Sequence, residues 1–340
     1  MENQNSTVNF RLLFVTQVVD HEDPVLGFVI RWIKEFVSQG AKLTVFARKL
    51  KPQDLPVSVI GLDLGQPKIR RILKLWYHSI KHRRDYDVVL VHMTPEILVL
   101  GWPIWALLGK RVYLWYMHRS VTWWLKAALW MSRKAFTGSD LSLRVDTPKK
   151  VVVGHGIDTE QFKPLDVQRQ PEVLWISRIQ PRKRLEDSLN FMSEFRRQNP
   201  DVSWTMRIIG SAQDHEDYLA DMQREAGRLG IADRIKFEGP MEHDVLPDVF
   251  AKAAAFISTS QTGSLDKVVL ESLACGTPVL AKGEEYAGLQ GVVSLADQLS
   301  AFSSLRTWLL DPKTDQAAQE GIIKQHNLRR LITRLVQEMK

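Results

Sequence analysis

Apolar residues in the first half of the chain recur as short continuous runs, separated by segments with helical spacing. The runs cover 10–16, 41–46, 87–92 and 111–116, and each is long enough for one strand buried on both faces. Between the first two runs, residues 28–38 place their apolar side chains on one helical face, and Gly40 follows as a cap. Strands that alternate with helices predict βαβ units and a parallel sheet.

The same pattern starts again after residue 170. Strands are predicted at 172–177, 205–210, 235–238, 255–258 and 278–281, with helices at 185–198 and 217–230. The segment 162–171 between the halves is polar, carries prolines towards both ends and lacks periodicity, so it is the predicted linker. The predicted fold class is α/β, with two Rossmann-like doubly wound domains whose strand C-termini face a cleft.

The end of the chain, from 317 to 340, again has apolar residues at helical spacing and is predicted to be helical. The predicted organisation is therefore an N-terminal domain at 1–165, a C-terminal domain at 166–325 and a final helical segment at 326–340. A chain of 340 residues is long enough for two such domains, each with its own core.

Composition places the chain among ordinary globular proteins. Hydrophobic residues make up 44% and charged residues 25%, without a low-complexity tract, so disorder is expected only at residues 1–8. A single cysteine excludes an intramolecular disulfide framework and fits a reducing compartment. The polar N-terminus lacks a signal-peptide core, and the longest uncharged apolar run, 97–109, is shorter than the roughly 20 residues of a spanning helix. We therefore expect a cytoplasmic protein.

The net charge of +7 is concentrated in the first half of the chain. Residues 1–165 carry 24 Lys and Arg against 14 Asp and Glu, whereas 166–340 carry 22 against 25. Tryptophan follows the same division, since eight of the eleven precede residue 165. Nucleic acid is the weaker interpretation of this charge, because no nucleic-acid-binding motif accompanies it. The two halves are therefore expected to meet different partners.

A segment at 68–84 carries seven basic residues and no acid. Its apolar residues Ile69, Ile72, Leu73, Trp76 and Ile80 fall on one helical face, as in helices that bind anionic membrane surfaces. The alternative is an ordinary amphipathic helix that packs on the sheet. The residues assigned to a membrane or acceptor side are Arg70, Arg71, Lys74, Lys81, Arg83 and Arg84. Five tryptophans, Trp102, Trp105, Trp123, Trp124 and Trp130, could extend this surface, although core packing also explains some of them.

The stretch 263–281 contains the strongest candidate chemistry. A loop of small residues leads into a segment with helical spacing, which ends at Gly276 and Pro278 before a short apolar strand. The N-terminus of a helix after such a loop favours an anion, because free N–H groups and the helix dipole point the same way. Glu271 within this helix can accept hydrogen bonds from sugar hydroxyls. The combination predicts a nucleoside-diphosphate pocket, and the alternative is a plain strand–loop–helix–strand unit.

Three further segments follow predicted strands. Arg178 and Lys183 are two cations that can neutralise a diphosphate, and taken alone a solvated basic loop before a helix is the favoured alternative. Gly27, before the first helix, would let a ligand approach the backbone closely, and a plain turn is the alternative. His118 follows a strand end at the expected cleft edge, where a packed or surface histidine is the alternative.

In this order, the segments resemble glycosyltransferase family 4, the retaining enzymes of the GT-B fold. The resemblance covers nearly the whole chain and is strongest from Val151 to Ala281. Arg178 and Lys183 match the arginine and lysine of the family's G-R-x4-K-G, with Ser177 and Arg184 in place of the glycines. The remaining matches are 154–164 with N-G-[IV]-D…F-x-P (His155 replacing Asn), 237–247 with F-x-G…[LI]-P, and 270–279 with L-E-A-M-A-C-G-x-P-V.

One position departs from the family pattern. The family has two glutamates in an E-x7-E motif, and Glu271 matches the second, but Gly263 stands at the first. The missing glutamate would have met the donor sugar, whereas this loop offers Ser264, Asp266 and Lys267. A similar variant loop occurs in some members, so we expect activity to persist, with Asp266 or Lys267 recognising the sugar.

The resemblance implies the roles of the other residues. Arg178, Lys183 and the backbone near Lys267 and Val268 would hold the diphosphate, and Glu271 the ribose. His118 would contact the donor sugar and Gly27 would lie under the diphosphate; Gly210 and Met241 complete the donor-binding set. No metal or cofactor is expected, because the two cations neutralise the diphosphate, and a final helix is expected to cross back to the N-terminal domain.

The expected function is transfer of a sugar from a UDP or GDP sugar to a glycan or lipid-linked acceptor in envelope polysaccharide or glycolipid synthesis. Peripheral association with the inner face of the plasma membrane would bring the enzyme to such an acceptor. Two alternatives remain at this point. One is a nucleotide-sugar epimerase on the same fold, and the other is a non-catalytic nucleotide-sugar or membrane-binding protein, which the substitution at Gly263 would suit.

Overall fold

A computed structural model describes residues 10–21, 23, 26–51, 55–62, 68–260 and 263–340. The predicted disorder at 1–8, the polar N-terminus, and parts of the predicted loops at 22, 24–25 and 262 lie outside the described residues. The chain divides into two compact units: Met1–Gly156 with Leu328–Lys340, and Ile157–Asn327. Among the helices of the described residues, none combines the length and the apolar character needed to cross a bilayer.

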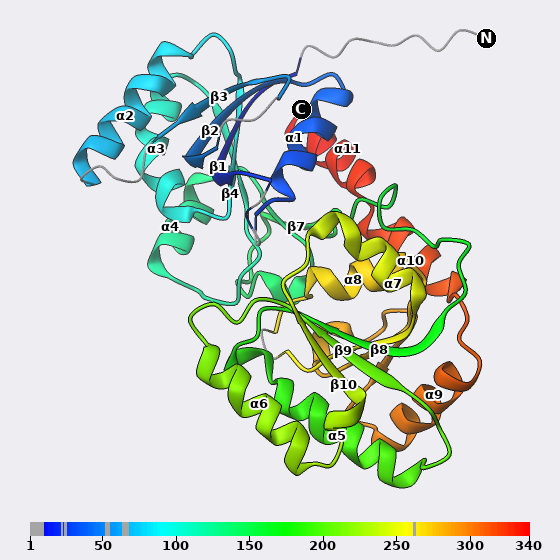
Figure 1. The fold of residues 1–340 in the computed structure, drawn as a ribbon. Helices are drawn as coiled ribbons and strands as arrows, with labels where there is room; N and C mark the ends of the chain where they lie inside the picture. Colours follow the sequence, from blue (N-terminus) through cyan, green and yellow to red (C-terminus); the bar gives the residue numbers. More distant parts are fainter. Residues whose placement is uncertain (1–9, 22, 24–25, 52–54, 63–67, 261–262) are drawn as a thin grey trace, which may run out of the picture. The chain divides into compact units, whose positions relative to one another are not determined.

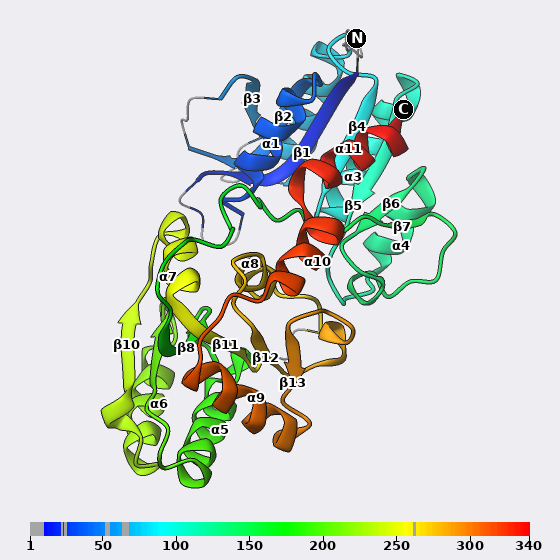
Figure 2. The same cartoon turned by 90° about the vertical axis from the view of Figure 1, so that its right-hand side faces the viewer.

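The first unit is built on a parallel sheet with strand order β3-β2-β1-β4-β5-β6-β7 (Figure 1 and Figure 2). Its strands are β1 (Arg11–Val19), β2 (Lys42–Leu50), β3 (Ser58–Gly61), β4 (Val88–His92), β5 (Arg111–Trp115), β6 (Ala135–Thr137) and β7 (Lys150–Val152). Its helices are α1 (Val29–Ser38), α2 (Lys68–Lys81), α3 (Pro95–Leu107), α4 (Trp123–Met131) and α11 (Leu328–Met339), with the 3-10 turn η1 (Asp140–Ser142).

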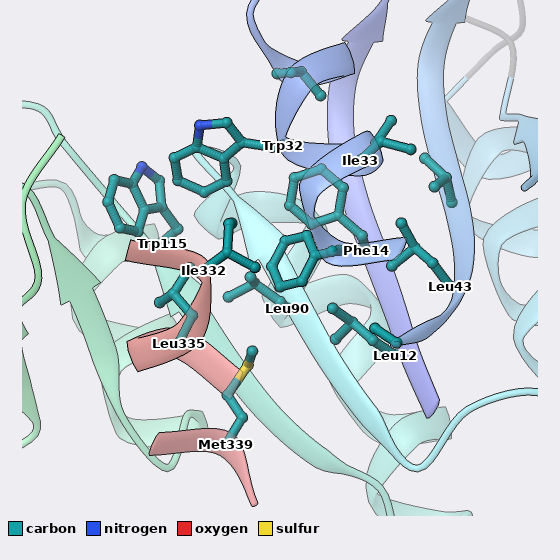
Figure 3. Packing of buried hydrophobic residues seen from close by; sticks show 14 of the residues in the cluster. Leu12, Phe14, Trp32, Ile33, Leu43, Leu90, Trp115, Ile332, Leu335 and Met339 are labelled. Carbon is teal, nitrogen blue, oxygen red and sulfur yellow. The ribbon is translucent and has the colours of Figure 1, made fainter. Parts of the chain in front are cut away.

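Helices cover both faces of this sheet, which is why its strands are continuously apolar. Alternate residues of β1 enter different cores: Phe14 packs with α1 and α11, whereas Leu13 packs with α2, α3 and α4. Figure 3 shows Trp32 of α1 and Leu335 of α11 on the same side of the sheet as Phe14. The last helix of the chain is therefore part of the core of the first unit.

The second unit has a parallel sheet with strand order β10-β9-β8-β11-β12-β13 (β8 to β10 in Figure 1, β11 to β13 in Figure 2). Its strands are β8 (Gln170–Ile176), β9 (Thr205–Ile209), β10 (Ile235–Gly239), β11 (Ala253–Ser258), β12 (Val279–Ala281) and β13 (Val292–Ser294). Its helices are α5 (Leu185–Gln198), α6 (Glu216–Arg228), α7 (Leu246–Lys252), α8 (Lys267–Ala274), α9 (Gln298–Leu310) and α10 (Gln316–His326). The 3-10 turns are η2 (Pro181–Lys183), η3 (Ala232–Arg234), η4 (His243–Val245) and η5 (Glu284–Tyr286).

The predicted fold class is confirmed: each unit is a Rossmann-like α/β layer structure with parallel strands. One boundary differs from the sequence predictions. The units divide after Gly156 instead of residue 165, because Ile157 and Phe162 are buried in the core of the second unit. The segment 317–340 is helical as predicted: α10 ends at His326, and α11 (Leu328–Met339) lies within the final segment predicted at 326–340.

Candidate functional site

A pocket in the second unit lies where the strand order of the sheet reverses. The C-terminal ends of β8 and β11 and the first residues of α8 line it. The chain runs from β8 to β9 on one side (Figure 1), while β11 pairs with the other side of β8 (Figure 2). Ligands of open parallel sheets bind beyond the carboxyl ends of the strands at such a reversal. A ligand of this sheet is therefore expected here.

Lys183 lines this pocket from η2 and is already paired. Its Nζ donates to Oδ2 of Asp266 at 2.9 Å and to Oγ of Ser260 at 3.2 Å. The Lys183 and Asp266 side chains are only 13% and 14% exposed, so water screens their attraction less than that of a surface ion pair. The structure thus brings together two of the residues predicted as catalytic, in a contact that the sequence did not indicate.

Arg178 follows β8 but is exposed, and its guanidinium has no hydrogen-bond or ion-pair partner in the described part of the chain. Its neighbour Ile179 is buried, and the Ile179 N–H donates to the carbonyl of Ser211 at 2.8 Å. The loop backbone is therefore held in place while the guanidinium extends into solvent. It remains available for an anion.

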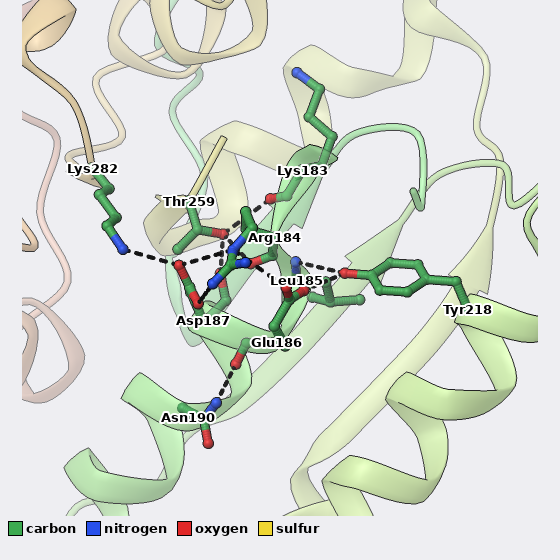
Figure 4. A network of polar contacts seen from close by, with 10 residues as sticks. Lys183, Arg184, Leu185, Glu186, Asp187, Asn190, Tyr218, Thr259 and Lys282 are labelled. Carbon is green, nitrogen blue, oxygen red and sulfur yellow. Dashed lines mark hydrogen bonds and ion pairs between the residues drawn. The ribbon is translucent and has the colours of Figure 1, made fainter. Parts of the chain in front are cut away.

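The turn that carries Lys183 is held by the residue that replaces the family's glycine. Arg184 has φ 54° and ψ 48°, a left-handed conformation that glycine adopts without steric cost. Its guanidinium pairs with Asp187 at 2.8 Å, Lys282 pairs with the same carboxylate at 3.0 Å, and Thr259 Oγ1 donates to the Arg184 carbonyl at 2.7 Å (Figure 4). In Figure 4 the Lys183 side chain points away from this network.

Glu271 lies one turn into α8 and is buried, with 4% of its surface exposed. Its Oε1 lies 3.0 Å from Nε2 of His243, in η4. A carboxylate only accepts, so Nε2 carries the hydrogen of this bond. Sequence reasoning missed His243, because no local pattern links a loop histidine to a carboxylate 28 residues later.

The loop before α8 places the other predicted sugar-side residues close to the pocket. Gly263 is left-handed, with φ 63°, which disfavours any side chain with a Cβ. Ser264, Lys267 and Val268 are half-buried, and Val268 lines the pocket beside Asp266. The departure from E-x7-E is therefore built into the backbone of the loop as well as into its side chains.

Two further predicted residues border the ends of β9 and β10. Gly210 is required by packing, because a Cβ there would come within 1.7 Å of the Ser177 carbonyl oxygen at the end of β8. Met241 is half-buried two residues after β10 and packs on the core that also contains Leu270 of α8. Cys275, at the end of α8, is not a nucleophile candidate, because burial raises the pKa of its thiol to about 12.

Two predicted residues belong to the first unit. A Cβ on Gly27 would lie 2.7 Å from the His21 carbonyl oxygen, and the Gly27 N–H donates to the Asp23 carbonyl at 2.9 Å, so the turn itself needs glycine. His118 is exposed after β5, and its Nδ1 accepts the N–H of Ser120 at 3.0 Å. Because Nδ1 accepts, a neutral His118 carries its hydrogen on Nε2, which is free of this contact.

The basic segment forms α2, but its apolar residues do not all face the core. Leu75 and Ser79 are buried, and Trp76 donates through Nε1 to the Leu100 carbonyl at 2.7 Å. In contrast, Ile69 is 72% and Leu73 55% exposed. The exposed basic residues beside this apolar stripe are Arg70, Lys81, Arg83 and Arg84, whereas Arg71 and Lys74 are half-buried.

A family model described as Glycosyl transferases group 1 matches residues 156–339. A D-inositol 3-phosphate glycosyltransferase of Acidothermus cellulolyticus is 32% identical over 143 residues, which is 38% of this chain and 32% of the relative. A GDP-mannose-dependent alpha-(1-6)-phosphatidylinositol monomannoside mannosyltransferase of Mycolicibacterium smegmatis is 30% identical over 50% of this chain and 49% of its own length. The matched regions thus span from a third to a half of these curated relatives.

Solved structures match over nearly the whole chain at low sequence identity. Anabaena Alr3699/HepE in complex with UDP has a TM-score of 0.75 and 17% identity, over 97% of this chain and 99% of that one. A glycosyltransferase from Rickettsia africae has a TM-score of 0.78 and 13% identity, over 98% of both chains. At these identities the similarity establishes a common fold.

Proposed function

This chain belongs to the glycosyl transferases group 1 family, and on that premise we propose that it transfers a sugar from a nucleoside-diphosphate sugar to an acceptor hydroxyl. One observation carries the proposal: the pocket at the sheet reversal combines the Lys183 ammonium with the N-terminus of α8, one turn before Glu271. An ammonium and a helix N-terminus favour a diphosphate, and a carboxylate accepts from ribose hydroxyls. The UDP complex of one structural relative and the GDP-mannose dependence of another relative support a UDP or GDP donor.

In this proposal, each predicted residue keeps a specific role. Arg178 and Lys183 bind the diphosphate together with the amides of Lys267 and Val268, and Glu271 binds the ribose. Asp266, Ser264 and Lys267 select the sugar in place of the glutamate that Gly263 replaces. The remaining donor-side residues are Gly210 and Met241 of the second unit and Gly27 and His118 of the first.

The proposed transfer retains the configuration at the anomeric carbon. The bond between this carbon and the diphosphate oxygen breaks, and the acceptor oxygen bonds to the same face of the carbon. The departing phosphate oxygen takes the acceptor's proton, so the step uses neither an enzymatic nucleophile nor a metal. Arg178 and Lys183 stabilise the negative charge that grows on the diphosphate, the kind of electrostatic stabilisation that often dominates catalysis.

The donor half of this proposal is tested by a thermal-shift screen of UDP, GDP, ADP and CMP sugars, because a ligand of the folded state raises Tm. The best donor is then incubated with a panel of glycan and lipid-linked acceptors, and NMR reads the anomeric configuration of the product. We expect donor-dependent stabilisation and a retained configuration. Binding without transfer to any acceptor would favour a non-catalytic protein, and an epimer formed without acceptor would favour an epimerase.

The proposed acceptor is lipid-linked or part of the cell envelope, and α2 is the proposed contact with an anionic membrane surface. The exposed Ile69 and Leu73, with Ile80 on the same helix, provide apolar area, and neighbouring cations provide attraction to anionic lipid. Trp130, 71% exposed on α4, adds an aromatic side chain of the kind enriched at membrane interfaces.

Flotation with phosphatidylglycerol vesicles at low salt tests this contact. We expect the wild type to bind and a variant with Ile69→Ser, Leu73→Ser and Ile80→Ser to lose most binding. The matched control replaces Leu299 and Leu310 by serine, two leucines exposed on α9 in the other unit, and should bind like the wild type. Failure of the wild type to float would exclude the membrane contact without affecting the donor assignment.

A further inference from the structure

Glu271 is a buried carboxylate that one side chain contacts through a hydrogen bond within the described residues. Within the described residues, its side chain makes one hydrogen bond, from Nε2 of His243 at 3.0 Å. A buried carboxylate without a partner is costly, so this contact determines where its oxygens lie. Because His243 uses Oε1, the second oxygen, Oε2, is left for a ligand.

His243 is itself held by the turn that precedes β8. Its ring lies 5.0 Å from the buried ring of Phe162, centroid to centroid. The next residue, Asp244, accepts from Nε2 of Gln161 at 2.9 Å. The imidazole therefore has one face packed on Phe162, and the side chain of the next residue is tied to the same turn, as expected of a side chain that orients another group.

His243 lies in η4, next to residues that are proposed to bind the nucleoside part of the donor. It follows β10 and Met241, which the proposed function places among the donor-binding residues, and it contacts the carboxylate assigned to the ribose. The turn at Phe162, part of the segment 154–164 that resembles a family motif, thus supports the side chain that holds Glu271.

We propose that His243 is a positioning residue for nucleotide binding: it fixes the Glu271 carboxylate so that Oε2 accepts from the ribose hydroxyls of the donor. This inference rests on the proposed nucleotide-sugar function and adds a residue to it. His243 acts on the nucleotide through Glu271, so its effect requires ribose hydroxyls. The diphosphate and the sugar contribute contacts that do not depend on it.

Two substitutions separate orientation from packing. His243→Phe keeps a ring against Phe162 but removes the N–H that donates a hydrogen bond to Glu271. His243→Gln keeps an N–H that can reach Glu271. Isothermal titration of UDP and GDP identifies the nucleotide that the wild type binds, and the matching 2′,3′-dideoxynucleoside diphosphate serves as the second ligand. Thermal unfolding of each variant establishes that it is folded.

We expect His243→Phe to raise the Kd of the ribonucleoside diphosphate about tenfold and His243→Gln to raise it less than about threefold. Wild type, His243→Phe and His243→Gln should bind the dideoxy ligand with similar Kd values. This ligand lacks the ribose hydroxyls that would donate to Glu271. In steady-state assays, the His243→Phe effect should appear in KM while kcat changes little.

Three outcomes would overturn the proposal. Equal Kd values for wild type and His243→Phe would exclude the positioning role. An equal loss with the dideoxy ligand would show that the substitution disturbs the site generally. Absence of any nucleoside diphosphate binding by the wild type would overturn the proposed function, and this inference with it.

Discussion

The Nζ of Lys183 and the Oδ2 of Asp266 lie 2.9 Å apart at the start of α8. The cation proposed to bind the donor diphosphate is thus neutralised by a carboxylate when no donor is present. Donor binding requires the diphosphate to displace that carboxylate, or to bind against its repulsion. Asp266 is therefore expected to weaken binding of the leaving group even if it helps to select the sugar.

Removing this negative charge should strengthen diphosphate binding. We expect Asp266→Asn to lower the Kd of UDP or GDP about threefold to tenfold, because the competitor for Lys183 loses its charge while its shape is kept. Titration calorimetry measures the change. Asp233→Asn, which removes an exposed carboxylate paired with Arg196, is the control and should leave Kd unchanged. Weaker nucleotide binding by Asp266→Asn would contradict the proposal that Asp266 competes with the diphosphate for Lys183.

Removing the cation should have the opposite effect. Lys183→Ala should lower kcat/KM at least tenfold, about 1.4 kcal/mol of transition-state stabilisation, because it removes a cation that stabilises the diphosphate while the negative charge of Asp266 stays beside it. Steady-state kinetics with the best donor provide the measurement, and Lys252→Ala, an exposed lysine of α7, is the matched control. A loss well under tenfold would count against the diphosphate role.

Restoring the family's missing glutamate should not improve the enzyme. Gly263 has φ 63°, so Gly263→Glu should strain the backbone and lower the free energy of unfolding by about 1 kcal/mol, without a gain in donor turnover. Gly263→Asn should cost less, because asparagine tolerates the left-handed region better. Urea denaturation and donor turnover assays test both parts. Higher turnover by Gly263→Glu would mean that the loop accommodates a glutamate after all.

Acid should destabilise the second unit through a buried histidine. Burial lowers the pKa of His326, at the end of α10, to about 4 from its ordinary value of 6.5. Between pH 6.5 and pH 4, His326 is protonated in the unfolded chain but largely neutral in the folded chain. The free energy of unfolding therefore falls as the pH drops through this range. At pH 5 the loss relative to pH 7 should be about 2 kcal/mol.

Urea unfolding of wild type and His326→Gln at pH 7 and pH 5 tests this linkage. His326→Gln should reduce the difference in free energy of unfolding between pH 7 and pH 5 by most of the part that His326 contributes. It also changes stability at pH 7. His118→Gln, at an exposed histidine, should keep the full pH dependence. Identical pH dependence of stability in wild type and His326→Gln would show that His326 is not the cause of the destabilisation in acid.

Most of the fold was predictable because buried parallel strands leave a strong local signal. The apolar run at 87–92 and the strand β4 agree to within one residue, and the helix predicted at 185–198 is α5. Periodicity alone does not show the break at Asn327, because both sides of it have helical spacing. The family resemblance implied the final helix at 326–340, which begins within two residues of α11.

Local patterns in the sequence can nominate candidate site residues, but they do not show long-range contacts. Lys183 and Glu271 were nominated from such patterns, and their roles remain a proposal. The pairing of Lys183 with Asp266 joins positions 83 residues apart, and no spacing rule indicates it. Helix α2 shows a related limit: periodicity placed Ile69 and Leu73 on one face, but it does not say whether that face meets the core or solvent.

The first unit is assembled from two separated stretches of chain, and this has a consequence for protein synthesis. Leu331, Ile332, Leu335 and Met339 of α11 belong to its core, yet a ribosome makes them after the whole of the second unit. Until they emerge, the apolar side of α1 that they cover lacks its partner. The second unit, continuous from Ile157 to Asn327, has no such dependence. All of its residues are made before α11, whereas the first unit cannot complete its core until residues 328–339 have been added.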